Sequence, residues 1–398
     1  MNPDFDIAIL GGGLVGSSLA CALDGSGWRV ALIEGAPARQ APPGFDDRRL
    51  ALAAASLNAL HALDVLPRLP TPASPIRRIH VSREGDFGAV RLDASEAGRD
   101  AFGAVVAAHS LGHALESRLA TLERLQMLRP CTLQGMEPVE GGWRLSLSGS
   151  TAAPTTRLVV GADGTQSSVR AVLGIGTEVH DYQQTLFVCS VGCDRDADGG
   201  AFERFTAQGP VAMLPMGRDY GAICAVASAD APRVRALDDA GYAAYLQSRF
   251  GWRAGRILRV GARSAYPLVR TVATALQGTR AVLMGNAAQT IHPIGAQGFN
   301  LGLRDALTFA ELLPATGDPG DAAVLSNYAA ARSEDRERTL AFSDGLARAT
   351  ANPSLGMHLL RSLGLVAMAN LPGLSAPLAS GAMGFRGRVP ALARGLRP

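Results

Sequence analysis

Three glycines near the start of the chain have the spacing G-x-G-x-x-G, at Gly11, Gly13 and Gly16. An apolar run at residues 5–10 precedes them, a segment with helical periodicity follows, and a second apolar run ends at Glu34. The first glycine permits a tight turn, the second lets the backbone approach a pyrophosphate, and the third packs the helix on the strand. Glu34 lies about 20 residues beyond Gly13, where a carboxylate accepts hydrogen bonds from a ribose diol. The pattern predicts dinucleotide binding, with NAD and FAD both open.

A second strand ends in glycine within residues 157–170, "RLVVGADGTQSSVR". Asp163 and Gly164 stand at the turn, and the stretch 165–168 supplies a candidate cap for a following helix. An Asp-Gly pair by itself is more typical of a plain β-turn. Its meaning therefore depends on whether other strand ends carry similar chemistry.

A third segment, residues 285–306, repeats this order of strand, glycine and helix. Gly285 and Asn286 end an apolar run, and the glycine-rich stretch "HPIGAQGFN" at 292–300 enters a helical pattern. A glycine costs a helix about 1 kcal/mol relative to alanine, so these glycines indicate a close ligand rather than helix stability. Three such junctions are consistent with one long ligand.

In this order, the three motifs resemble those of the class A flavoprotein monooxygenases, the para-hydroxybenzoate hydroxylase family, over roughly residues 4–370. The second family motif, DGxxSxxR, also matches Ser167 and Arg170. The resemblance implies an FAD cofactor and carries FAD-contacting roles to Gly11, Gly13, Gly16, Glu34, Arg48, Asp163, Gly164, Gly285, Asn286, Gln297, Gly298 and Asn300. His292 and Pro293 would shape the flavin edge, although a lone histidine is more often a structural hydrogen-bonding residue than a proton-transfer group.

Four stretches narrow the resemblance to the ubiquinone-biosynthesis hydroxylases: residues 45–53, 201–215, 285–305 and 361–372. Most of the wider family has Asp where this chain has Asn286, whereas these hydroxylases share the Asn. Asn keeps a carbonyl acceptor and loses the charge. The order "IGAQG" also departs from the usual AGQG, because Gly295 and Ala296 are exchanged, and this loop must be reshaped if it needs a positive φ at residue 296.

The resemblance implies a reaction in which NAD(P)H reduces FAD, O₂ forms a flavin C4a-hydroperoxide, and a phenol ring is hydroxylated. The implied substrate is a polyprenylated phenol of the 2-polyprenyl-6-methoxyphenol type. Two alternatives remain: a class A hydroxylase of a small soluble aromatic, and a non-catalytic FAD-binding scaffold in a biosynthetic complex, which the altered "IGAQG" order motivates. Reaction at a flavin needs no catalytic triad or metal set, because the cofactor carries the chemistry.

Composition excludes several other function classes. All 38 basic residues are Arg, so the chain has no Lys for a Schiff base or a P-loop. The formal net charge is only +3, and no basic run is interleaved with aromatics, which argues against nucleic acid as a partner. The five cysteines are scattered; only Cys189 and Cys193 are close, within a strand-like stretch, which predicts buried or incidental thiols rather than a metal site.

The remaining apolar segments predict a second, sheet-forming part of the chain. They lie at 77–94, 185–193, 209–216, 220–228 and 256–269. The fold class expected is α/β, with a Rossmann-like (GR2-type) FAD-binding domain, an inserted and mainly antiparallel substrate domain, and C-terminal helices. The expected FAD-binding domain comprises 1–75, 100–175 and 265–345, the substrate domain 76–99 and 176–264, and the helical region 346–398.

The two ends of the chain bear on its location. Asp4 and Asp6 stand where a signal peptide has basic residues, which predicts a cytoplasmic protein. Beyond Asp344 there is no acidic residue, and the apolar stretch "LGLVAMANLPGL" lies among arginines. Too short to span a bilayer, this stretch is expected either to lie on the inner face of a membrane or to pack on its own domain or another subunit, in a homo-oligomer or a biosynthetic complex.

Overall fold

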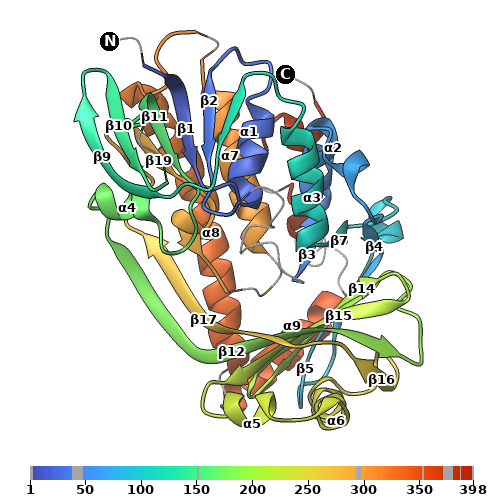
Figure 1. Ribbon diagram of the computed structural model, residues 1–398. Helices are drawn as coiled ribbons and strands as arrows, with labels where there is room; N and C mark the ends of the chain where they lie inside the picture. Colours follow the sequence, from blue (N-terminus) through green and yellow to red (C-terminus); the bar gives the residue numbers. More distant parts are fainter. Residues whose placement is uncertain are drawn as a thin grey trace.

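The first strand, β1 (Phe5–Leu10), is buried along its whole length because it lies between two parallel neighbours. An uninterrupted apolar run is typical of such a strand, which is covered on both faces. The computed structural model to which it belongs (Figure 1) describes residues 3–37, 48–149, 152–292, 294, 297–314, 316–351, 354–370, 380–385 and 387–396.

Eight strands make up the sheet around β1. Its main path is β18-β19-β11-β1-β2-β8, and the β9–β10 hairpin joins it through β11. The central pairings are parallel, as expected for a nucleotide-binding sheet. The strands besides β1 are β2 (Val30–Ile33), β8 (Leu125–Leu128), β9 (Leu133–Val139), β10 (Gly142–Leu147), β11 (Thr155–Gly161), β18 (Gln277–Gly278) and β19 (Ala281–Leu283).

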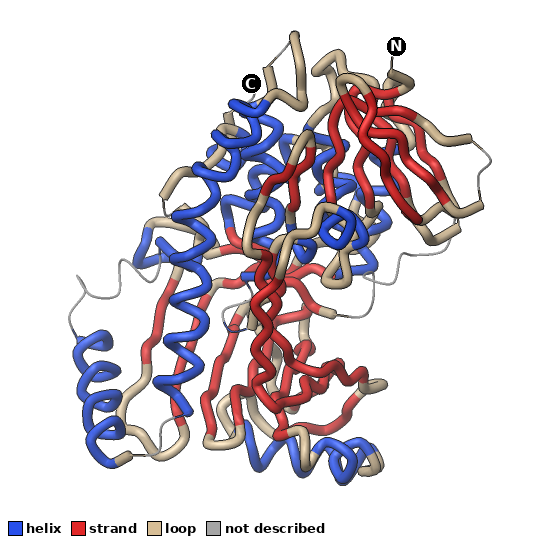
Figure 2. The backbone as a smooth tube through the Cα atoms, turned by 90° about the vertical axis from the view of Figure 1, so that its left-hand side faces the viewer, coloured by secondary structure: helices blue, strands red, loops and turns tan. Residues whose placement is uncertain are grey.

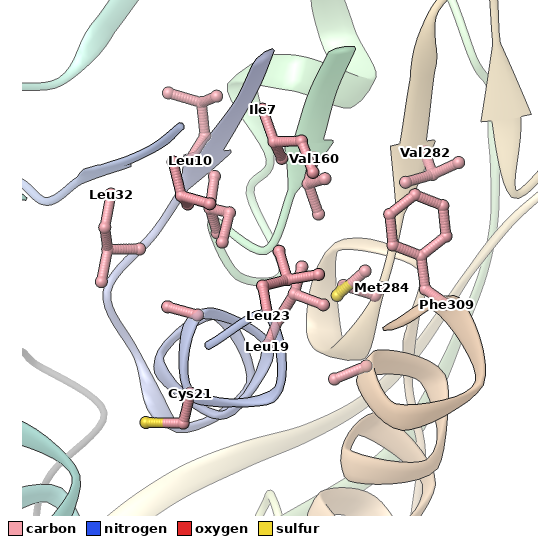
Figure 3. Packing of buried hydrophobic residues seen from close by; sticks show 14 of the residues in the cluster. Ile7, Leu10, Leu19, Cys21, Leu23, Leu32, Val160, Val282, Met284 and Phe309 are labelled. Atoms are coloured by element: carbon pink, nitrogen blue, oxygen red, sulfur yellow. The ribbon is translucent and has the colours of Figure 1, made fainter. Parts of the chain in front are cut away.

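Helices pack against this first sheet and form the largest apolar core. They include α1 (Leu14–Ala22), α3 (Ala108–Leu119) and α7 (Gln297–Leu312). Figure 3 shows Leu19 of α1 and Phe309 of α7 turned toward the side chains of the sheet. Burial of one such side chain contributes about 1.5–3 kcal/mol, so the packing fixes how the strand ends and the helix starts are placed.

A second sheet of nine strands is mainly antiparallel. Its path is β20-β17-β12-β15-β14-β13-β5-β6, with β16 on β12. The long strand β12 contains a register shift between Asp181 and Thr185, where Gln183 has a positive φ. The strands are β5 (Arg78–Arg83), β6 (Val90–Asp93), β12 (Thr177–Cys193), β13 (Gly200–Thr206), β14 (Gly209–Met216), β15 (Asp219–Ala227), β16 (Ile257–Val260), β17 (Ser264–Ala273) and β20 (Gln289–Thr290).

A third, three-stranded sheet lies between the two larger ones: β3 (Arg49–Ala53), β7 (Gly103–Ala107) and β4 (Ser74–Ile76). The remaining helices are α2 (Ala54–Ala62), α4 (Ser168–Val172), α5 (Ala231–Arg235), α6 (Asp239–Phe250), α8 (Ala322–Ala351) and α9 (Leu355–Asn370). In Figure 2 the long helix α8 runs beside both halves of the molecule, and α9 lies at the edge of the lower sheet. The predicted α/β class and the insertion of an antiparallel sheet are confirmed.

The chain passes between the two large sheets several times. Strands β5 and β6 leave the first half early, and β12 to β17 form a longer excursion. Because β17 pairs with β12, residues 264–273 lie in the second sheet. The boundary expected from the sequence places residues from 265 onward in the FAD-binding domain instead. We propose to keep the division into an FAD-binding domain, a substrate domain and a C-terminal helical region, with β17 counted in the substrate domain.

Candidate functional site

Glycine is present at the three positions of the first junction for different structural reasons. A Cβ on Gly16 would lie 2.0 Å from the Gly11 carbonyl oxygen. Gly11 itself has φ +104°, and a Cβ there would lie 2.4 Å from the Ala162 carbonyl oxygen. Both positions therefore exclude larger residues. Gly13 caps the N-terminus of α1, and a Cβ there would meet no atom within 4 Å. Open space in front of a helix N-terminus, where N–H groups and the helix dipole favour negative charge, is suited to a phosphate.

Glu34 is buried beside this junction at the end of β2. Its two carboxylate oxygens accept hydrogen bonds from the N–H groups of Gly12, at 2.7 Å, and Ala36, at 2.8 Å. Each oxygen retains a second lone pair. The side chain is thereby fixed next to the glycine turn with acceptor capacity left for a ligand.

At the second junction, the two carboxylate oxygens of Asp163 have different surroundings. Its Oδ2 accepts from the N–H groups of Ser168, at 2.7 Å, and Val169, at 3.1 Å, at the start of α4. Its Oδ1 is buried and has no hydrogen-bond partner among the residues described. A buried carboxylate oxygen without a donor is costly, so this atom points to a ligand donor. Ser167, within the predicted cap stretch, is the N-cap of α4.

Arg170 connects the second junction to the third. Its guanidinium donates to the carbonyl oxygens of Ala287, at 2.8 Å, and Thr165, at 2.7 Å. The hydroxyls of Thr165 and Thr290 are also 2.7 Å apart. The family's second motif thus contributes, through Arg170, a structural connection between the two glycine turns.

The third junction contains one outward-facing residue in a buried segment. From Ala281 to Gln289 only Asn286 is exposed, because Gly285 (φ +57°) turns the chain under Val15 of α1. Nearby, α7 begins at Gln297, and a Cβ on Gly298 would meet open space. Pro293, Gly295 and Ala296 lie outside the described residues.

The side chain of Asn300 forms structural hydrogen bonds that its motif does not predict. Its Oδ1 accepts from Ala53 N, at 3.0 Å, and Ser56 Oγ, at 2.7 Å, while Nδ2 donates to the Ala51 carbonyl at 2.9 Å. Both lone pairs of the side-chain oxygen are therefore used. Asn300 holds strand β3 against α7, and its predicted direct contact with FAD stays a prediction.

Sequence inspection missed the charged residues that support the third junction. Asp305 of α7 accepts from the Gly285 N–H at 3.1 Å, and Arg332 of α8 donates to its other oxygen at 2.7 Å. Arg332 also pairs with Asp335 at 2.7 Å, which in turn pairs with Arg304. Burial alone would raise the pKa of Asp335, but Arg304 and Arg332 outweigh it and hold that pKa below its ordinary value. The sequence does contain a clue to these ion pairs, because Arg304 and Asp305 stand side by side in a largely apolar helix. A buried charge requires a partner, so such a pair predicts further charged residues nearby.

His292 is buried just before α7. Its Nδ1 accepts the N–H of Ile294 at 3.2 Å, and burial lowers the pKa of the imidazole to about 4, with Asp344 opposing the shift. The ring is therefore neutral at pH 7 and holds the backbone at the entrance of the helix. Arg48, by contrast, is exposed, with its guanidinium carbon 5.6 Å from the centre of the Tyr266 ring.

A cavity of about 490 Å³ begins beside the third junction and is enclosed by the second sheet, the three-stranded sheet and helices α7, α8 and α9. At one end lie Gln297 and strand β3, and at the other lies α9. Most of its wall is apolar, with side chains from the second sheet, from in and next to the three-stranded sheet, and from α8 and α9: Ile76, Ile79, Val81, Leu92, Phe102, Leu214, Ile223, Phe342, Leu365 and Met368. This volume is within the range of about 300–1,000 Å³ that is typical of small-molecule sites.

Comparison with known proteins agrees with this geometry. Residues 4–343 match the family described as "FAD binding domain". The chain is 35% identical to a protein named ubiquinone hydroxylase UbiL from Rhodospirillum rubrum, over 95% of this chain and 89% of that one. It is 31% identical to a 3-demethoxyubiquinol 3-hydroxylase from Escherichia coli, over 92% of this chain and 95% of that one. A crystal structure of p-nitrophenol 4-monooxygenase from Pseudomonas putida has the same fold, with a TM-score of 0.80 at 17% identity, over 98% of this chain and all of that one.

The residues present fit FAD. The open space at Gly13 and Gly298, the unpartnered oxygen of Asp163 and the outward-facing Asn286 come from the three junctions. Arg170 connects the second junction to the third, and Gly285 of the third packs against Val15 of α1, which follows the first. When bound, FAD supplies the redox and oxygen-activating chemistry, and the protein supplies binding and orientation. The chain belongs to the FAD-binding domain family, and within it to the FAD-dependent monooxygenases that include the ubiquinone hydroxylases.

Proposed function

We propose that this protein hydroxylates the ring of a polyprenylated phenol, of the 2-polyprenyl-6-methoxyphenol type, in ubiquinone biosynthesis. FAD is the cofactor, NAD(P)H the transient reductant and O₂ the oxidant. The names of the relatives from R. rubrum and E. coli support the pathway.

The observation that supports a prenylated substrate is the apolar cavity. It leads from the Gln297 end of α7 to α9, so a molecule lying in it would place one end at the glycine-rich junctions and the other below α9. A phenol ring needs only the first part of such a cavity. The remaining length, bounded by Leu92, Leu365 and Met368, suits an aliphatic tail.

We propose that the site residues divide the work as follows. Gly11, Gly13, Gly16 and Glu34 hold the ADP half of FAD, and Asp163, Gly164, Gly285, Asn286, Gln297 and Gly298 hold the rest, with Arg48 beside the flavin. Because His292 is neutral and buried, its part is to shape the loop, together with Pro293, and not to transfer a proton. The apolar cavity wall excludes water that would divert the reaction.

Anaerobic reduction of the FAD-loaded protein by NADPH tests this proposal. We expect reduction to be strongly accelerated by 2-prenyl-6-methoxyphenol and weakly by 2-methoxyphenol, which lacks the tail. Equal acceleration by both compounds would favour a small soluble aromatic as the substrate. A flavin that neither NADPH nor NADH reduces, with or without phenol, would contradict the proposed activity.

A further inference from the structure

Helix α9 (Leu355–Asn370) has two faces of different exposure. One face closes the cavity through Arg361, Gly364, Leu365 and Met368. The opposite face is aliphatic and exposed: Leu359 by 55%, Leu360 by 64%, Leu363 by 69% and Val366 by 42%. Scattered exposed apolar residues are ordinary, but four on one face of one helix form a patch that indicates an interaction surface.

The β5–β6 turn extends this surface. Phe87, at the turn, is 78% exposed, and its N–H donates to Ser362 Oγ of α9 at 3.1 Å. A Cβ on the next residue, Gly88, would lie 3.1 Å from a methyl group of Val366. Phe87, Leu359, Leu360, Leu363 and Val366 are hereafter the apolar patch.

An ion cluster fixes α9 to the turn. The Asp86 carboxylate is inaccessible to solvent and pairs with Arg83 at 3.1 Å and with Arg361 at 2.8 Å, and its Oδ1 lies at hydrogen-bond distance, 2.5 Å, from His358 Nδ1. The last two partners belong to α9. The apolar patch is therefore a surface with a defined geometry, held over the far end of the cavity.

Basic and aromatic residues lie on the face of β5 and β6 that is turned away from the cavity, and His80 and Arg91 are close in sequence to the turn that contains Phe87. His80 of β5 is paired in register with Arg91 of β6, and Arg253 contacts the His80 ring. Among the described residues, neither Arg91, Arg204 nor Arg253 forms an ion pair with an acidic side chain. Burial and the charges of Arg204 and Arg91 lower the pKa of Arg253. Trp252, next to Arg253, is 66% exposed.

We propose that the apolar patch docks on the surface of a lipid bilayer and that α9 passes the isoprenoid tail of the substrate from the bilayer into the cavity. This inference rests on the proposed function, because a polyprenylated phenol resides in a membrane. Exposed leucines and Phe87 suit the boundary of headgroups and acyl chains, where tryptophan is also favoured. The unpaired arginines suit anionic headgroups. Within the described part of the chain, no helix is long and apolar enough to cross a bilayer.

Vesicle sedimentation tests the proposal. The full-length, FAD-loaded protein is mixed with phosphatidylglycerol–phosphatidylcholine vesicles, and the double variant Leu360→Glu/Leu363→Glu is compared with Leu258→Glu. Leu258 is a matched control, because it is 61% exposed but lies on β16, outside the patch. We expect the wild type and L258E to sediment with vesicles and the double variant to lose at least about ten-fold in binding. Pure phosphatidylcholine should bind less than the mixed vesicles.

Equal vesicle binding by the double variant and L258E would overturn the proposal, as would a wild type that does not bind. A patch-dependent dimer in sedimentation velocity, without vesicle binding, would show that a second copy covers the patch and would also overturn it. Hydroxylation in detergent separates the two inferences. Activity without vesicle binding contradicts docking alone, and vesicle binding without activity on any prenylphenol contradicts the proposed function alone.

Discussion

The Tyr182 ring stands edge-on against the imidazole of His292, with ring centres 4.8 Å apart and planes at 90°. The Tyr182 hydroxyl donates to Asp344 of α8, and the same carboxylate pairs with Arg270 of β17. Two strands of the second sheet, the long helix and the loop before α7 therefore meet at one point. This arrangement couples the position of the third glycine junction to the sheet that walls the cavity.

Removing the ring of Tyr182 should disturb this junction more than removing its hydroxyl. Tyr182→Phe loses one hydrogen bond, worth about 1 kcal/mol, and keeps the contact with His292. Tyr182→Ala loses both the hydrogen bond and the ring contact with His292, so it should cost more than Tyr182→Phe. We expect Y182F to consume NADPH with nearly wild-type yield of hydroxylated product and Y182A to release more hydrogen peroxide. The fraction of NADPH converted to peroxide measures this, and equal peroxide yields would contradict the coupling.

The buried imidazole of His292 should make the folded state sensitive to acid. Burial lowers its pKa from 6.5 to about 4, so between these values the unfolded chain binds a proton that the folded protein does not. The contribution of His292 to stability is therefore complete above pH 6.5 and declines as the pH falls toward 4. Urea unfolding at pH 7.5 and 5 should show a smaller pH dependence in His292→Asn than in the wild type, because Asn keeps an acceptor for the Ile294 N–H and does not titrate.

A matched control uses another histidine of the same chain. His113 of α3 is exposed, and His113→Asn serves as the control for exchanging a histidine for an asparagine elsewhere in the chain. His80, whose pKa burial and two arginines lower to about 4, should contribute a similar acid sensitivity and remain in both variants. An unaltered pH dependence in H292N would contradict the assignment of a neutral, buried imidazole.

The Asp305–Arg332 pair should support both folding and FAD binding. Arg332→Met leaves the buried Asp305 carboxylate without its cation, which typically costs about 3–5 kcal/mol. Because Asp305 also accepts the Gly285 N–H, the variant should retain less FAD after gel filtration. Glu334→Gln breaks the exposed pair with Arg338 on the same helix and should have little effect on either quantity. Similar unfolding free energies for both variants would refute the support role of the pair.

The Oδ1 atom of Asp163 should contribute to FAD binding and not to the stability of the folded apoprotein. Asp163→Asn keeps one acceptor for α4 and changes the charge at the ligand side, so we expect FAD affinity to fall by about ten-fold, while the apoprotein unfolds at nearly the same urea concentration. Ser167→Ala should show the reverse, because it removes only the helix cap, worth about 1 kcal/mol. FAD titration by fluorescence quenching, with unfolding of each apoprotein, distinguishes the two. An unchanged FAD affinity in D163N would remove Asp163 from the site.

Filling the cavity should discriminate between substrates with and without a tail. Ala212 of β14 lines the cavity wall, and Ala212→Phe would occupy part of the space assigned to the isoprenoid chain. We expect KM to rise by about ten-fold or more for a prenylated phenol and to change little for 2-methoxyphenol, because only the tail meets the new ring. Steady-state kinetics with both compounds checks this. An equal effect on both would place the ring, rather than the tail, beside Ala212.

The sequence predicted those parts of the fold that local patterns encode. Strand β1 and the glycine turn after it are recognisable because burial on both faces demands an apolar run and close packing demands Gly16. Strand β14, Gly209–Met216, has the bounds that its apolar pattern predicts. The bulge in β12 was not predictable, because its cause is pairing with distant strands and not the residues at the bulge.

The candidate site was predictable only where a motif carried it. The spacing of the motifs predicts the glycine positions and Asp163. The structure adds the Oδ1 atom of Asp163 that has no partner among the described residues, which supports a ligand-binding role for this side chain. The support by Asp305 and Arg332 depends on two helices crossing, and the engagement of Asn300 with β3 joins residues almost 250 positions apart. The cavity below α9 likewise exists only because segments distant in sequence enclose it.

The most direct test of the account is product analysis under ¹⁸O₂. The FAD-loaded protein is given NADPH and 2-prenyl-6-methoxyphenol, and the products are identified by mass spectrometry. We expect a ring-hydroxylated prenylphenol that contains one ¹⁸O atom, formed in proportion to the NADPH consumed. NADPH oxidation that yields only hydrogen peroxide with prenylphenols of any tail length would contradict it.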